Sequence, residues 1–134
     1  MKIKHVSITT DKLSIANNHI KKGNYKLNPL MNRSTGRIDD NRYFTQINLK
    51  IDGASEQNFP VNLEVSMRAT FTFDNLDPLD DTNAFLKTEG VNILFPYLRA
   101  AVTNLSTAAM MPPIILPIMN AAALFKQSEQ HTIN

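Results

Sequence analysis

Strict alternation between apolar and polar side chains over Pro60–Asp74 constrains the fold more than any other feature of the sequence. The apolar residues occupy one parity, and they are Val61, Leu63, Val65, Met67, Ala69, Phe71 and Phe73. Successive side chains of a strand point to opposite faces, so the pattern predicts one long strand with a buried face and a wet face. Arg42–Asp52 alternates in the same way, and the polar connection Gly53–Phe59 predicts an antiparallel hairpin.

Weaker strand signals precede this hairpin. His5–Ile15 can supply one or two short edge strands, and Asn24–Met31 can supply another. Arg33–Asn41 is polar and contains a glycine, which predicts a connection. The expected sheet therefore has about four antiparallel strands within residues 1–75.

The period changes to that of a helix at about residue 82, after a turn rich in acidic residues. Apolar residues then recur at heptad-like spacing through Leu94 and Ala108, with a bend expected near Gly90 and Pro96. The stripe is wide, so we expect one side on the sheet and another against a second subunit. The predicted oligomer interface comprises Leu94, Tyr97, Leu98, Ala101, Val102 and Leu105.

The doubled proline Pro112–Pro113 ends this helix, and a short second helix is expected over residues 118–126. Residues 127–134 then form a frayed tail. The helical part would span about 82–126, and residues 1–134 would form one domain. The predicted fold class is α+β, with a four-stranded antiparallel sheet followed by one long and one short helix.

Composition excludes several classes of function. The chain has no cysteine, which excludes thiolate metal sites and fits a reducing, cytoplasmic compartment. Its three histidines are scattered, and no phosphate loop or catalytic triad can be assembled, so we expect a non-enzyme without metal or cofactor. The apolar run over residues 108–125 contains three prolines and is too short and broken for membrane insertion.

Basic residues concentrate in the first 50 positions, which could mark an anion-binding or nucleic-acid-binding surface. The candidates are Lys21, Lys22, Lys26, Arg33 and Arg37. They are scattered and lack interleaved aromatic residues, so solvated sheet edges explain them better. No nucleic-acid partner is expected.

An apolar run that prolines keep out of regular structure follows the long helix. Its members are Met110, Met111, Ile114, Ile115, Leu116, Ile118 and Met119. Methionine and isoleucine form adaptable surfaces that accept varied partners, so the run can bind polypeptides. It can equally close the core beneath the sheet, and the residue pattern leaves both interpretations open.

The motif NILFPYLR at Asn92–Arg99, the proline-broken segment and a later NAAALF ending at Phe125 together resemble the SecB export chaperones. That family carries an NILFPYAR-like helix and a DALF-like second helix. The resemblance implies a homotetramer, built as a dimer of dimers, that binds unfolded or precursor polypeptides without ATP. Carried over by position, it assigns client contact to Ile114, Ile115, Leu116, Ile118, Met119 and Phe125, beside Met110 and Met111 of the same run.

Export members of that family use an acidic sheet face and tail to engage the SecA motor. Here the candidate outer face is mixed in charge, the pI is near 9.0 and the tail has a single acid, Glu129, so SecA docking is doubtful. Three functions stay open: a general holdase, a chaperone with a dedicated client such as an antitoxin, and an oligomeric scaffold without a client groove.

Overall fold

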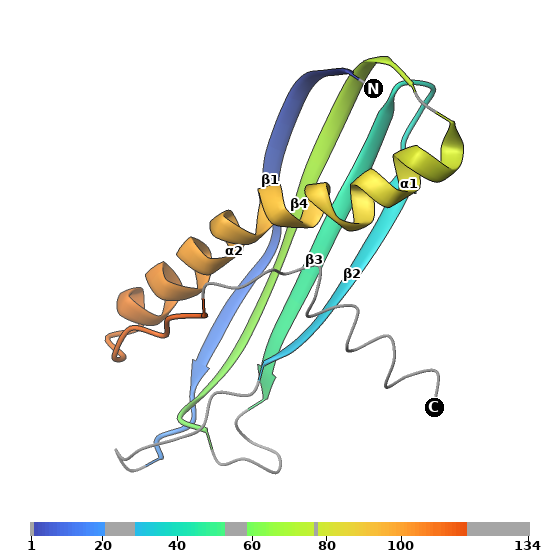
Figure 1. The fold of residues 1–134 in the computed structure, drawn as a ribbon. Helices are drawn as coiled ribbons and strands as arrows, with labels where there is room; N and C mark the ends of the chain where they lie inside the picture. Colours follow the sequence, from blue (N-terminus) through green and yellow to red (C-terminus); the bar gives the residue numbers. More distant parts are fainter. Residues whose placement is uncertain (1, 21–28, 53–58, 77, 118–134) are drawn as a thin grey trace, which may run out of the picture.

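The computed structural model describes residues 2–20, 29–52, 59–76 and 78–117. Its elements are β1 (Lys2–Asn17), β2 (Leu30–Arg37), β3 (Arg42–Asp52), β4 (Val61–Asn75), α1 (Leu79–Lys87) and α2 (Glu89–Ala108). The strands form one antiparallel sheet in the order β1-β4-β3-β2, and both helices lie across the same face (Figure 1). The predicted α+β architecture with a four-stranded antiparallel sheet is confirmed.

The two central strands form the predicted hairpin. Ile47 of β3 lies opposite Met67 of β4, and Leu49 lies opposite Val65. Every inward side chain of β4 from Val61 to Phe73 is buried, while the alternate residues are partly exposed. The period-two pattern thus places one continuous apolar face on the helical side of the sheet.

Helix α2 covers that apolar face. It packs on β3, β4 and β1, while α1 lies over β2 and β3 (Figure 1). The side chains of Leu94, Leu98 and Val102 have no exposed surface. The expectation that the long helix covers the sheet is therefore confirmed.

Strand β1 corrects the expectation of short edge segments, because it is one strand of 16 residues at the edge of the sheet. Ile8 lies opposite buried Ala69, and Leu13 lies opposite buried Val65, although their positions differ in parity. A register shift between Thr10 and Lys12 accounts for the change. Because of this bulge, the apolar residues of β1 do not alternate without interruption, and the sequence pattern did not predict one long strand.

Strand β2 corrects two further expectations. It spans Leu30–Arg37, so the residues following Arg33 are paired with β3 and do not form the expected connection. Of the strand expected over Asn24–Met31, residues 24–28 lie outside the described residues. Arg33 lies on the helical side of the sheet and donates from Nη1 to the carbonyl of Lys87 at 2.7 Å. This bond explains why a charged residue occupies that face.

The helical layer begins at Leu79, earlier than expected, and it breaks at Thr88. This break lies two residues before Gly90, so the bend expected near Gly90 is confirmed, whereas Pro96 lies inside α2. Pro96 has no N–H to donate to the carbonyl of Asn92, so α2 lacks one hydrogen bond there. Both residues are exposed, so water can bond to the carbonyl of Asn92. The expected second helix and tail lie outside the described residues.

Gly90 lets α2 approach the sheet closely. A Cβ atom at this position would lie 2.4 Å from Oγ1 of Thr45. That hydroxyl is buried and donates to the carbonyl of Leu86 at 2.7 Å, so it cannot move without leaving a polar group unpaired. The crossing of α2 over β3 therefore depends on the missing side chain.

We expect Gly90→Ala to lower the free energy of unfolding by about 1–3 kcal/mol, although alanine favours helices. The matched control is the same substitution in a Thr45→Ala background, where the clashing hydroxyl is gone. There Gly90→Ala should become neutral or stabilising. Chemical denaturation of the four proteins measures this coupling, and an equal loss in both backgrounds would contradict the explanation.

Candidate polypeptide-binding site

The end of α2 places an apolar side chain in solvent through an unusual backbone conformation. Met111 donates its N–H to the carbonyl of Ser106, and Met110 donates to the carbonyl of Thr107. These two bonds form a Schellman cap, whose left-handed residue is usually glycine. Here that residue is Met110, with a φ of 61° and 91% exposure.

The chain then turns back along α2 as the proline segment, which we define as Pro112–Pro117 (Figure 1, orange-red after the helix). Two side chains of α2 hold its middle. Ile114 donates its N–H to Oγ of Ser106 at 2.9 Å, and its carbonyl accepts from Oγ1 of Thr103 at 2.8 Å. Both main-chain groups of one residue thus face the helix.

A third bond extends this attachment, since Nε of Arg99 donates to the carbonyl of Leu116 at 3.0 Å. Burial alternates along the same residues. Leu116 is 1% exposed, Ile114 packs partly against the core, and Ile115 between them is 66% exposed. This alternation is that of an extended chain with one side against the core and the other in water.

The predicted client-contact residues therefore divide into three groups. Met110 and Ile115 are exposed, while Met111 and Ile114 are half-buried against the core. Leu116 belongs to the core, which corrects the expectation that it faces a client. The remaining predicted contacts, Ile118, Met119 and Phe125, lie outside the described residues.

The predicted oligomer-interface residues also divide. Leu94, Leu98 and Val102 are fully buried inside one chain, and Ala101 and Leu105 pack partly against its core. Only Tyr97, which is 53% exposed, stands clear of that core. The first three residues are therefore core of the single chain, and the predicted contact of this set with a second subunit stays a prediction.

The opposite face of the sheet is polar and mixed in charge. Arg68 stacks 3.8 Å from the ring centroid of Phe44 and donates from Nη2 to Oε1 of Gln46 at 2.8 Å. The ammonium of Lys12 forms an ion pair with Glu64 and donates a hydrogen bond to its carboxylate, and this bond lowers the pKa of Glu64. Over the described strands, this face carries neither a uniform charge nor a continuous apolar surface.

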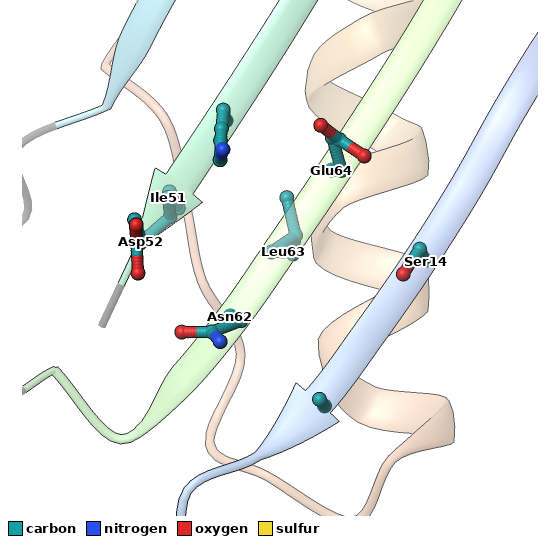
Figure 2. Close-up of a pocket in the computed structure, with 8 residues that line it drawn as sticks. Ser14, Ile51, Asp52, Asn62, Leu63 and Glu64 are labelled. Atoms are coloured by element: carbon teal, nitrogen blue, oxygen red, sulfur yellow. The ribbon is translucent and has the colours of Figure 1, made fainter. Parts of the chain in front are cut away.

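A shallow depression of about 320 Å³ lies on this face near the ends of β1, β3 and β4. Ser14, Asn62 and Glu64 line it on the side away from the helices (Figure 2). Its lining is mainly polar, so it offers little to an apolar chain segment.

The part of the chain that the structure describes also bears on three features that the sequence argued against: a metal site, a membrane span and a basic binding surface. There, no three histidine or acidic side chains come together to hold a metal ion, and neither helix is long and apolar enough to cross a membrane. Arg33 bonds to Lys87, and Arg37 pairs with Asp40 at 2.6 Å. The other basic candidates, Lys21, Lys22 and Lys26, lie outside the described residues.

The fold and the exposed proline segment define a SecB-type architecture, and comparisons with known proteins agree. The family model described as preprotein translocase subunit SecB matches residues 3–132. The chain is 30% identical over 103 residues to the protein-export protein SecB of Neisseria meningitidis serogroup B, covering 75% of this chain and 69% of that protein. This chain belongs to the SecB family, which supports a chaperone or protein-export role.

Two further proteins resemble this chain, one in sequence and one in fold. An uncharacterized protein of Methanocaldococcus jannaschii is 32% identical over 95 residues, covering 69% of this chain and 59% of that protein. The fold matches a Mycobacterium tuberculosis SecB-like chaperone, solved in complex with a ChAD peptide from the HigA1 antitoxin. That match has a TM-score of 0.72 at 19% identity and covers 88% of this chain and 89% of the other.

Sequence reasoning missed the three side chains that hold the proline segment. Arg99, Thr103 and Ser106 recur at a spacing of four and three residues on α2. That spacing places them on one face, as a polar stripe beside the apolar one. Such a stripe, on a helix followed by a proline-rich segment, is the signal that could have revealed the attachment.

Replacing Met110 by glycine should raise the free energy of unfolding by about 1 kcal/mol, because glycine tolerates the positive φ and no buried surface is lost. Ala109→Gly is the matched control, since Ala109 has a φ of −83° and glycine there should destabilise by about 0.5–1 kcal/mol. Thermal and urea denaturation measure both. Equal destabilisation by the two substitutions would contradict the assigned cap.

Proposed function

We propose that this chain is a cytoplasmic, ATP-independent holdase that binds unfolded polypeptides at Met110, Ile115 and the half-buried Met111 and Ile114. The observation that carries the proposal is the exposure of apolar side chains on a segment that α2 holds in place from behind. A side chain exposed only by chance needs no such support. Met110 also occupies a backbone position that favours glycine, which is consistent with a side chain kept for its surface.

Burial of the exposed side chains against a client supplies the binding free energy. Each fully buried isoleucine or methionine contributes roughly 1.5–3 kcal/mol. The proline segment is already ordered by three hydrogen bonds, so binding does not have to order it. A few such contacts give weak, reversible capture, which suits a holdase without an energy source.

We further propose that the outward face of α2 joins subunits in a homotetramer, built as a dimer of dimers. Pro96, Tyr97 and Ala100 are exposed there, and the only charged residues of α2 are Glu89 and Arg99. Small and aromatic side chains without charge suit close packing between helices. Several client sites in one assembly would raise the apparent affinity through effective concentration.

The identity of the client separates two versions of this proposal. Family membership supports unfolded precursors in export, whereas the mixed outer sheet face lacks the acidic surface expected for engaging SecA. A dedicated client, as in the antitoxin-peptide complex of the structural relative, is the second candidate. An oligomeric scaffold without a client groove is the third.

The double substitution of Met110 and Ile115 by serine tests the site. We expect it to keep the fold and the oligomeric mass but to lower client affinity at least tenfold, because two apolar contacts are lost. Leu79→Ser is the matched control: Leu79 is 63% exposed, close to the 66% of Ile115, but belongs to α1. Light scattering of denatured proteins diluted into stoichiometric amounts of each variant reports the activity.

Three outcomes would contradict parts of the proposal. Full activity of the double variant would remove the site. Failure of the unmodified chain to protect any of several unrelated clients would exclude the general holdase, and a pull-down from the source cell would then test for a dedicated client. Loss of folding together with binding would favour the scaffold.

A further inference from the structure

The main chain of the proline segment has two unlike edges. The inner edge is used, because the N–H and carbonyl of Ile114 and the carbonyl of Leu116 all bond to side chains of α2. In an extended chain, the polar main-chain groups of successive residues point in opposite directions. The N–H and carbonyl of Ile115 therefore point away from the helix.

Nothing within the described residues hydrogen-bonds to these two groups of Ile115. Ile115 as a whole is 66% exposed. Pro113 and Pro117 have the same parity as Ile115, and proline has no N–H. The outer edge consequently offers a single main-chain donor, with an acceptor on the same residue.

We propose that the outer edge of the proline segment captures an extended, apolar stretch of client polypeptide by main-chain pairing with Ile115. One client residue would donate its N–H to the carbonyl of Ile115 and accept from its N–H, as in a hydrogen-bonded antiparallel pair. The inference rests on the proposed holdase function and specifies how the client's backbone is recognised.

The surroundings of the edge suit this occupant. Residues 108–117 contain no charged side chain, and Met110 and Ile115 expose apolar surface beside the free main-chain groups. A client strand laid along the edge would place alternate side chains on that surface. Any residue except proline supplies the required N–H, so this mode of recognition does not depend on client sequence.

The flanking prolines also limit the number of main-chain hydrogen bonds that the outer edge can form. A longer row of free donors would template sheet growth and aggregation. With Pro113 and Pro117 beside it, Ile115 can form one pair and no continuous ladder. The same two residues therefore keep a permanently exposed edge from pairing indiscriminately.

Ile115→Pro, compared with Ile115→Ala, tests the pairing. Both substitutions remove most of the exposed side chain, but only proline also removes the N–H. The probe is a fluorescent, unstructured, uncharged apolar peptide without proline, used beside a version N-methylated at alternate residues. Fluorescence anisotropy measures affinity, and circular dichroism and mass measurement verify fold and assembly.

Alanine should weaken binding several-fold, and proline should weaken it about fivefold more, because proline removes the N–H donor of the pair and so one of its two hydrogen bonds. N-methylation removes the client N–H that donates to the carbonyl of Ile115, so it should weaken the peptide on the unmodified chain and on Ile115→Ala. Equal affinities of the proline and alanine variants would overturn the pairing while leaving the holdase intact. Failure of the unmodified chain to bind either peptide or any unfolded client would overturn both.

The comparison of the plain and N-methylated peptides on the unmodified chain is decisive even if the proline variant does not fold. Equal affinity of the unmodified chain for the plain and N-methylated peptides would overturn the proposal. A change in oligomeric mass on Ile115→Pro, without any effect of peptide methylation, would assign the edge to a second copy of this chain. A clear loss on peptide methylation would support client pairing.

Discussion

Burial of the apolar face shared by β3 and β4 is the constraint on which the rest of the structure depends. Alternation makes that face continuous, and α2 is the element that covers it. The helix lies close enough only because Gly90 has no side chain to meet Thr45. Leu94, Leu98 and Val102 are fully buried in this contact, whereas Tyr97 on the outer side of α2 and Met110 and Ile115 beyond its end are exposed.

In the proline segment, the attachment of two residues to α2 and the core also determines which residue is exposed. Leu116 enters the core and Ile114 is hydrogen-bonded to α2, so the residue between them must point outwards if the chain is extended. Exposure of Ile115 thus follows from how its neighbours are held. An accessible apolar side chain on a firmly attached backbone is the property that a holdase needs.

Alternation and helical spacing made the central hairpin and α2 predictable, because those signals reflect local geometry. Strand β1 was recognised only in pieces because its bulge near Lys12 changes the parity of its inward residues. Strand β2 was misplaced because Arg33 faces the helical layer, where it bonds to the end of α1. A charged residue in such a position is explained only by tertiary contacts.

The candidate site was predictable as a region but not residue by residue. The apolar run and the family resemblance identified the right segment, yet neither distinguishes buried Leu116 from exposed Ile115. That distinction depends on Thr103 and Ser106, which lie in an earlier helix and act through hydrogen bonds to the main chain. The apolar pattern alone contains no information on such bonds, and only the polar stripe of Arg99, Thr103 and Ser106 on α2 points to them.

Intermolecular nuclear Overhauser effects between a protonated unfolded client and methyl-labelled chaperone test the central claim most directly. Labelled Met, Ile and Leu methyl groups would report on Met110, Ile115 and Leu116 in one experiment. The account predicts strong contacts from the client to Met110 and Ile115 and none to buried Leu116. Client contacts that avoid the first two residues and concentrate on the outer sheet face would contradict it.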